Sequence, residues 1–362
     1  MESERTNHPT KFQQALFGLC DRIRLLLERL PAERQGEITE IRLRCGQPLV
    51  CTTAEGPVFF PVVGGVCRLP RPGLLTVDRA DLEESFRRIC DFSIHTHQQE
   101  LSRGYVTMQG GHRVGICGRA VVTDGRVTSL QEICSINIRI AREVRGAADA
   151  LLRLLTERTD GREPQVSRTR GPLTGGLLLA GPPGSGKTTM LRDLVRQLSS
   201  GNFGSPLRVV AVDERGELGA VWNGIPQNDL GPCTDILTGC GKAVGIEMAV
   251  RAMGPEAVAF DELGTAAEAR AVGACLNAGV LAITTLHAGS PRELLQRPQA
   301  LCLLESGAIE AVALLRRPGE TPRLFNREEL YAQVDGPHNP GLYGGRRGSL
   351  FFKQAAGKNR TA

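Results

Sequence analysis

Residues 181–189 constrain the fold more than any other part of this sequence. They read Gly-Pro-Pro-Gly-Ser-Gly-Lys-Thr-Thr, which fits the pattern G-x-x-x-x-G-K-[ST]. A continuous apolar run at 177–180 comes before them, and apolar residues at helical spacing follow over 190–198. A strand, a glycine-rich turn and a helix in this order predict a loop that binds phosphate. The backbone N–H groups and the helix N-terminus would then both face the anion.

Two side chains of this loop have predicted roles of their own. Lys187 is expected to reach the β- and γ-phosphates of a nucleotide, and Thr188 is expected to be a ligand of Mg²⁺. ATP and Mg²⁺ are therefore the predicted cofactors. The residues predicted to bind the nucleotide are Gly181, Pro182, Pro183, Gly184, Ser185, Gly186, Lys187, Thr188 and Thr189.

The second half of the chain reads as an α/β domain. Short apolar runs at 177–180, 209–212, 257–260 and 280–283 alternate with helical patterns. Strands buried on both faces and separated by helices are typical of a parallel sheet. We therefore predict a RecA-like P-loop ATPase domain with a parallel sheet.

The first half reads as a smaller α+β unit. An amphipathic helix is expected over 11–30, a strand over 37–45 and short strands with glycine turns over 105–140. A further helix is expected to begin at Asp81, with Glu84 completing a capping box. Residues 156–175 are expected to be a linker or surface loop. The predicted domains are 1–145, 146–330 and a flexible tail rich in Gly, Arg and Lys at 331–362.

Composition limits the function classes. A net charge of +5 over 362 residues is too small to argue for nucleic-acid binding. No stretch reaches the roughly 18 consecutive apolar residues that a membrane helix needs, and the N-terminus lacks the order of a signal peptide. We therefore expect a cytoplasmic protein whose contact with a membrane is made through partners. The absence of N-K-x-D or T-K-x-D gives no support to a GTPase.

Two acidic pairs follow apolar strands. Asp261 is assigned to the Mg²⁺ shell and Glu262 to orienting the attacking water, because one complete strand, ending at Asp213, lies between the loop and this pair. An inserted strand with Glu after the metal-side Asp is the pattern of ATPases that activate water with their own glutamate. From the other pair, Glu214 is a candidate catalytic residue, and a local helix cap is the alternative for Asp213 and Glu214.

The strand after this pair ends in Thr284-Thr285-Leu286-His287. The helix between them is well bounded, since Thr265 and Glu268 form a capping box and Gly279 ends it. Polar residues at the end of the strand are expected to face the γ-phosphate, and His287 is a candidate functional residue. An incidental surface histidine is the alternative.

The order of these segments resembles the secretion-superfamily ATPases of type II and type IV systems. The likeness lies in an acidic box at 212–217, the Phe-Asp-Glu of 260–262 and a histidine box at 284–288. The sequence is still more similar to the family of stage III sporulation protein AA. That likeness also includes Pro-Gln-Asn-Asp at 226–229, Gly-Gly-His-Arg-Val-Gly at 110–115 and Ile-Arg-Ile-Ala-Arg-Glu-Val at 138–144.

The resemblance implies a homo-hexameric motor whose two domains close over ATP at a subunit boundary. It also implies docking to integral membrane proteins at the cytoplasmic face of the sporulation channel between mother cell and forespore. The predicted function is thus an Mg²⁺-dependent ATPase that powers or gates this channel. Two alternatives stay open: a RecA-like ATPase stimulated by nucleic acid, and a nucleotide-binding adaptor that assembles the channel without hydrolysis.

The first domain contains a dense set of arginines. Arg139 lies in an Ile-Arg-Ile alternation that directs it away from the core face. We expect Arg139, with Arg113 or Arg119, to cross the subunit boundary to the γ-phosphate, and Arg251 to supply a matching contact from the ATPase domain. A solvated basic face is the alternative.

Overall fold

The computed structural model describes three stretches of the chain, residues 9–93, 97–159 and 173–335. The chain divides into two compact units, which are described separately. The first unit is Met1–Glu143 with Ala220–Asn228, and the second is Val144–Gly219 with Asp229–Ala362.

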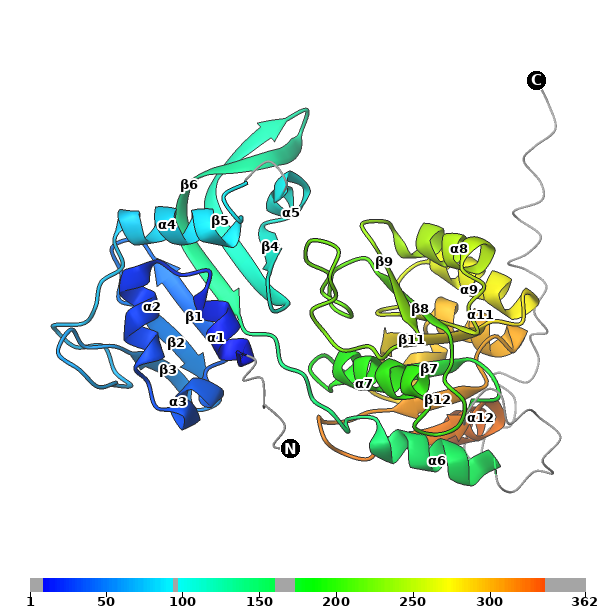
Figure 1. The fold of residues 1–362 in the computed structure, drawn as a ribbon. Helices are drawn as coiled ribbons and strands as arrows, with labels where there is room; N and C mark the ends of the chain where they lie inside the picture. Colours follow the sequence, from blue (N-terminus) through cyan, green and yellow to red (C-terminus); the bar gives the residue numbers. More distant parts are fainter. Residues whose placement is uncertain (1–8, 94–96, 160–172, 336–362) are drawn as a thin grey trace, which may run out of the picture. The chain divides into compact units, whose positions relative to one another are not determined.

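The first unit is built on a six-stranded antiparallel sheet (Figure 1) with the order β3-β2-β1-β6-β5-β4. Its strands are β1 (Glu40–Arg44), β2 (Val50–Thr53), β3 (Gly56–Phe59), β4 (Tyr105–Met108), β5 (His112–Thr123) and β6 (Arg126–Arg139). The strands over 105–140 are therefore longer than expected, because β5 and β6 form one extended hairpin.

Except for Ala32–Glu37, which has no buried residue, the described helices of the first unit bury apolar side chains in one core with the sheet. They are α1 (Lys11–Leu16), α2 (Asp21–Glu28), α3 (Ala32–Glu37), α4 (Arg79–Ile89) and α5 (Gln98–Ser102). The single helix predicted over 11–30 is wrong, because the chain breaks near Gly18. A Cβ at Gly18 would lie 2.9 Å from Cε of Met108 and 3.0 Å from Cγ1 of Ile89, so the turn packs closely against these two side chains.

The predicted start of α4 is also shifted. Asp78 is the N-cap residue, and its capping box is completed by Asp81 rather than by Glu84. Both pairings have the same spacing in the sequence. The structure favours the earlier one because Asp81 is buried and also accepts a hydrogen bond from Arg22.

The second unit contains a seven-stranded sheet with the order β13-β12-β7-β11-β10-β8-β9. All neighbours are parallel except β12 and β13. The strands are β7 (Leu177–Gly181), β8 (Val209–Asp213), β9 (Thr234–Thr238), β10 (Ala257–Phe260), β11 (Leu281–His287), β12 (Ala311–Leu314) and β13 (Arg323–Asn326). The predicted fold class, a RecA-like α/β domain after a smaller α+β unit, is confirmed.

The strand order corrects one step of the sequence argument. Two strands, β8 and β9, separate the loop from Asp261 along the chain, not one. The strand that lies between β7 and β10 in the sheet is β11, which follows both in the sequence. Order along the chain therefore differs from order in the sheet, and the end of β11 lies directly between the phosphate loop and the Asp261-Glu262 pair.

Each central strand contributes to two cores, one on each face of the sheet. In β7, for example, Leu177 and Leu179 pack on one side, and Leu178 and Ala180 pack on the other. The first face is covered by α6 (Asp149–Thr159) and α7 (Lys187–Ser200). The second is covered by α8 (Lys242–Ala252), α9 (Ala266–Asn277), α10 (Pro291–Leu295), α11 (Pro298–Ser306) and α12 (Arg327–Asp335).

Several segment boundaries differ from the expectation. Helix α6 reaches Thr159, so the first residues of the predicted linker at 156–175 are helical, and 160–172 lie outside the described residues. Helix α12 includes 331–335, the first five residues of the predicted tail; the rest of the tail is outside the described residues. The segment Ala220–Asn228, from the second half of the chain, belongs to the first unit. There Lys11 donates a 2.7 Å hydrogen bond to the carbonyl of Gln227.

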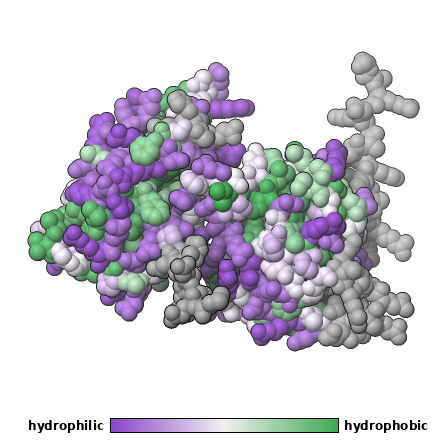
Figure 2. Space-filling view, viewed as in Figure 1, coloured by the Kyte–Doolittle hydropathy of each residue, from purple (hydrophilic) through white to green (hydrophobic). Residues whose placement is uncertain are grey.

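The face of the first unit seen in Figure 2 is largely hydrophilic but includes apolar areas. Val62, Val63, Val66 and Leu69 are exposed in the connection between β3 and α4, which forms the green area at the left edge of Figure 2. Exposed apolar residues that cluster in this way are typical of contact surfaces. None of the helices within the described stretches is long and apolar enough to cross a membrane.

Candidate active site

The phosphate loop connects β7 to α7 and depends on backbone geometry that only glycine adopts easily. Gly184 and Gly186 have φ values of +74° and +90°. A Cβ at Gly181 would lie 2.4 Å from Oγ of Ser185, so this position also excludes a side chain. The buried Oγ of Ser185 has no hydrogen-bond partner in the protein, and it lines the cavity described next. A hydroxyl at this position can donate a hydrogen bond to an oxyanion ligand.

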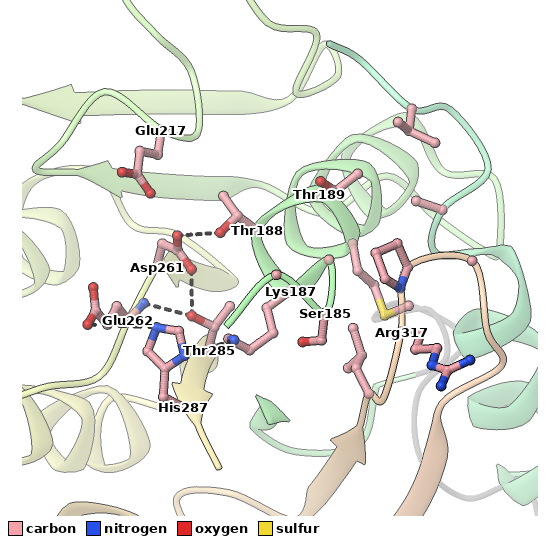
Figure 3. A pocket seen from close by; sticks show the side chains of 18 of the residues that line it. Ser185, Lys187, Thr188, Thr189, Glu217, Asp261, Glu262, Thr285, His287 and Arg317 are labelled. Carbon is pink, nitrogen blue, oxygen red and sulfur yellow. Dashed lines mark hydrogen bonds and ion pairs between the residues drawn. The ribbon is translucent and has the colours of Figure 1, made fainter. Parts of the chain in front are cut away.

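The loop borders a cavity of about 570 Å³. Figure 3 shows Thr188, Asp261, Glu262, Thr285 and His287 grouped on one side of it, with Arg317 on the other. The apolar part of the lining is formed by Val144, Ala147, Met190, Leu315 and Pro318. The cavity is thus lined by polar side chains and, in part, by apolar ones.

Lys187 is buried at the base of this cavity. Its ammonium donates 2.9 Å hydrogen bonds to the carbonyls of Gly181 and Pro182, and it lies 3.1 Å from Nδ1 of His287. Burial lowers the pKa of Lys187, while the charges of Asp261 and Glu262 act in the opposite direction. A charged ammonium can only donate, so Nδ1 of His287 accepts and the neutral ring carries its proton on Nε2.

Thr188 and Asp261 form the candidate metal site. The Thr188 hydroxyl donates a 2.7 Å hydrogen bond to Oδ2 of Asp261, and the Thr285 hydroxyl donates a short one to Oδ1. No group of three or more His, Cys, Asp or Glu residues suited to a metal occurs in the described parts of the chain. A hydroxyl and a carboxylate fit Mg²⁺, which keeps several waters and takes its other ligands from phosphate oxygens.

Glu262 follows directly and has an unusual backbone. Its φ of +62° is left-handed, a conformation that costs a residue other than glycine about 1 kcal/mol. Its carboxylate Oε2 accepts a 2.6 Å hydrogen bond from Arg215, and Oε1 lies 4.0 Å from Nε2 of His287. The side chain is about one-third exposed and lines the cavity. One carboxylate oxygen is therefore held by a guanidinium while the other faces the histidine.

The two acidic residues at the start of the acidic box make different contacts, and a catalytic role of Glu214 stays a prediction. Asp213 is buried, and its carboxylate accepts hydrogen bonds from the backbone N–H groups of Glu217 and Gly219, both at 2.8 Å. Asp213 thus stabilises the following turn, but it is not the helix cap of the alternative, because no helix begins there. Glu214 does not line the main cavity, and its carboxylate lies 4.0 Å from the Lys242 ammonium. Glu217 is the residue of this box whose carboxylate approaches Asp261 in Figure 3.

The two predicted arginines lie in different units. Arg139 ends β6 in the first unit, with 65% of its side chain exposed and Nε 3.5 Å from Glu40. Arg251 is near the C-terminus of α8, is 81% exposed, and lies 3.7 Å from Glu247. Neither lines the cavity, so their roles at a subunit boundary stay predictions.

Sequence reasoning missed four residues of the site: Arg215, Glu217, Lys242 and Arg317. Arg215 and Glu217 belong to the acidic box at 212–217, and their place in that short charged segment was the available signal. Lys242 and Arg317 come from other segments. No motif marks them, because their positions depend on contacts between distant parts of the chain.

Comparison with known proteins gives a consistent set of relatives. The family model described as sporulation stage III, protein AA, matches residues 10–329. Stage III sporulation protein AA of Bacillus subtilis (strain 168) is 35% identical over 306 residues, which cover 83% of this chain and 91% of that protein.

Solved structures with a detectable likeness include two ATPases. The pilus retraction motor PilT with bound ADP is 16% identical, with a TM-score of 0.48 and coverage of 84% of this chain and 80% of that one. The ATPase DotB of Legionella pneumophila is also 16% identical, with a TM-score of 0.46 and coverage of 76% and 72%.

Proposed function

Since this chain belongs to the family of sporulation stage III protein AA, we propose that it is an Mg²⁺-dependent ATPase that powers or gates a sporulation secretion channel. The observation that carries the proposal is the 2.7 Å contact between the Thr188 hydroxyl and the Asp261 carboxylate at the mouth of the phosphate loop. It joins the loop to the end of β10 at the point where a nucleotide-bound cation would be held.

The cavity supports ATP as the ligand. The N–H groups of the loop and the unsatisfied hydroxyl of Ser185 suit the phosphates, and the apolar lining at Met190 and Pro318 suits a base. Lys187 would exchange its two carbonyl partners for phosphate oxygens. Mg²⁺ would neutralise charge on the β- and γ-phosphates, with Thr188 and Asp261 as its ligands from the protein.

Glu262 is the residue best suited to activate water. Its carboxylate is adjacent to the metal-side Asp261, and Oε1 faces His287 Nε2–H rather than a cation. A carboxylate that is partly exposed and next to the γ-phosphate position can accept a proton from the attacking water. Arg215 restrains the other oxygen and so limits the orientations of the side chain.

We further propose that the protein works as a homo-hexamer in the cytoplasm, at the inner face of the membrane, and associates with integral membrane proteins of the channel. In this arrangement Arg139 of one subunit would reach the γ-phosphate bound by another. Membership of the family supports the sporulation role, and the exposed side chain of Arg139 is compatible with a contact between subunits.

The test is ATP turnover by the purified full chain, measured as phosphate release with Mg²⁺ and with EDTA. We expect turnover in Mg²⁺ that disappears in EDTA and rises when the candidate membrane partner is present in vesicles. Stimulation by single-stranded DNA but not by the partner would favour the RecA-like alternative. A nucleotide-loaded oligomer with no turnover under any of these conditions would favour the assembly adaptor.

A further inference from the structure

Lys242 is a buried cation next to the catalytic turn. It is the first residue of α8, its side chain is only 7% exposed, and it lines a small polar recess with Glu214 and Glu262. Its ammonium donates hydrogen bonds to the backbone carbonyls of Asp261 (3.3 Å) and, at short range, Glu262. A single ammonium therefore binds the two carbonyls on either side of the left-handed residue.

The N–H groups of the same turn are bound from the opposite side. The amide of Glu262 donates a 2.8 Å hydrogen bond to the Thr285 hydroxyl, and the amide of Leu263 donates one of 2.8 Å to the Thr285 carbonyl. The turn at Glu262 is thus held between a lysine from α8 and a threonine from β11. This explains how a residue with a Cβ is kept at φ +62°, since such conformations persist only where the surroundings impose them.

The charge of Lys242 is balanced by Glu268, which is equally buried. The ammonium lies 3.4 Å from Oε1 of Glu268. The other oxygen of Glu268 accepts hydrogen bonds from the amides of Gly264 (2.7 Å) and Thr265 (3.1 Å) at the start of α9. Lys242 therefore connects the start of α8, the catalytic turn and the start of α9.

We propose that Lys242 is a positioning residue for hydrolysis: it holds the backbone of Glu262 in the left-handed conformation from which its carboxylate faces the attacking water. This rests on the proposed ATPase function. Lys242 does not line the nucleotide cavity, so it acts through Glu262 and not on the phosphates. Small displacements of a catalytic group reduce the rate strongly while binding is retained.

The main test uses the double substitution Lys242→Met/Glu268→Gln. Methionine alone would leave the Glu268 carboxylate buried without its ammonium, which is strongly destabilising. Glutamine removes that charge and still completes the capping box with Thr265. We expect kcat to fall on the order of 10- to 100-fold, since a displacement of about 1 Å can cost about 10²-fold. The affinity for ATP should change by less than about threefold, because binding precedes the lost step.

A matched control is Arg270→Met on the neighbouring helix α9. Arg270 is exposed, so the substitution replaces a cationic side chain by methionine in the same helix layer without touching the turn. We expect its kcat to equal that of the wild type. If the double variant does not fold, Lys242→Gln/Glu268→Gln keeps a hydrogen-bond donor in the recess but shortens its reach. Its kcat should also fall, but by a smaller factor than in the Lys242→Met/Glu268→Gln variant.

A double-mutant cycle separates positioning from a general structural effect. In protein that already carries Glu262→Gln, the Lys242→Met/Glu268→Gln change should cost less than about threefold in single-turnover rate, because the group that Lys242 positions is already lost. The proposal would be overturned if the Lys242→Met/Glu268→Gln change lowered the rate by the same factor with and without Glu262→Gln. An equal fall in ATP affinity and kcat would also overturn it.

Amide hydrogen exchange supplies a readout that does not depend on hydrolysis. The amides of Glu262 and Leu263 are protected through Thr285, and we expect their exchange to become at least about tenfold faster in the double variant but not in Arg270→Met. Unchanged exchange would show that Lys242 does not hold the turn. A wild-type protein without turnover would contradict the proposed function, while the exchange result would still decide the positioning.

Discussion

The two units of the molecule use their buried polar side chains in different ways. In the second unit, Lys187 and Thr285 are buried but lie against a cavity, where their hydrogen bonds are made to groups that a ligand could replace or use. In the first unit, Asp81 and His112 are buried in the interior. Asp81 caps α4 and is paired with Arg22, and His112 accepts a hydrogen bond from the Ala141 amide.

The difference suggests that the second unit provides the groups for ligand chemistry and that the first unit uses its buried polar groups for stability. In the second unit, Lys187, Asp261 and Thr285 meet at one cavity, as chemistry on a bound ligand needs. Other buried polar groups of this unit, such as Asp213 and Glu268, stabilise a turn and a helix start. Polar groups of the first unit end helices and strands, so their removal should affect stability before activity. Arg139 is the exception, because it is exposed on the first unit and has a predicted role in hydrolysis.

The prediction with the largest expected effect is that a residue of the first unit, Arg139, takes part in hydrolysis. If Arg139 reaches the γ-phosphate of another subunit, Arg139→Ala should lower kcat by about 10³-fold or more, as the loss of an arginine finger does. The affinity for ATP should change far less. Phosphate release and equilibrium nucleotide binding, measured on the same preparation, would show the two effects separately.

Mixing experiments show whether the site is shared between subunits. Arg139→Ala and Lys187→Ala proteins, combined after exchange of subunits has been demonstrated, should regain some activity, because a part of the boundary sites then contains neither lesion. Mixtures as inactive as the separate variants would leave the first unit with a structural role only, as would full activity of Arg139→Ala itself.

A second prediction sharpens the catalytic side of the comparison. Glu262→Gln keeps the shape of the side chain and a partner for Arg215, but an amide cannot accept the proton from water. We expect kcat to fall about 10²- to 10³-fold, the usual contribution of a positioned base, while ATP remains bound. Single-turnover hydrolysis and nucleotide retention test this. An equal loss of binding and turnover would indicate a structural carboxylate instead.

The third prediction concerns the phosphate loop. Lys187→Ala removes a buried charge that donates to two carbonyls in the free protein and would donate to phosphates in the complex. Charged hydrogen bonds of this kind contribute about 1.5–3 kcal/mol, so the affinity for Mg·ATP should fall about 10- to 100-fold. Titration calorimetry measures the affinity, and the unfolding midpoint without nucleotide provides the control for the fold. Unchanged affinity would contradict the assignment of the loop.

The second unit was the more predictable of the two because its signals are contiguous. The phosphate loop, the apolar strands and the capping box of Thr265 and Glu268 each occupy one short run of residues, and each depends on local geometry. The rule that parallel strands present ligands at their carboxyl ends was enough to bring Asp261 towards Thr188. The same rule could not predict the position of Lys242. The residues that its ammonium contacts lie in other segments of the chain, and no pattern around Lys242 indicates them.

The first unit was less predictable because its signals are ambiguous locally. Apolar residues at helical spacing continue through 11–30, but in the structure α1 ends at Leu16 and α2 begins at Asp21, with Gly18 packed against Met108 and Ile89 between them. The two possible capping boxes before α4 have equal spacing, and tertiary burial of Asp81 decides between them. Such choices depend on contacts between residues far apart in the sequence, which periodicity does not contain.

The smallest expected effect is a pH dependence of stability that comes from the first unit. His112 is fully buried, and burial, with a smaller contribution from the charge of Lys11, lowers its pKa from 6.5 to about 3. Nδ1 accepts a 3.0 Å hydrogen bond from the Ala141 amide. A second proton on the ring would have to go to Nδ1, where it would break this bond.

Protonation of His112 therefore favours the unfolded chain. The folded pKa lies below the unfolded value, so the stabilisation is complete above pH 6.5 and is lost as the pH falls towards 3. Between pH 6.5 and 5 the loss of unfolding free energy amounts to about 2 kcal/mol, at about 1.4 kcal/mol per pH unit.

The variant His112→Gln tests this. It keeps a side-chain acceptor but cannot be protonated, so its unfolding free energy should fall less steeply over this range, even if it is lower at pH 7. Urea unfolding of both proteins at pH 7, 6 and 5 measures the difference in slope, in which the other titrating groups cancel. If the unfolding free energy fell equally with pH in both proteins, the buried ring would not stay neutral in the folded protein. The hydrogen bond from the Ala141 amide would then not keep protons from Nδ1.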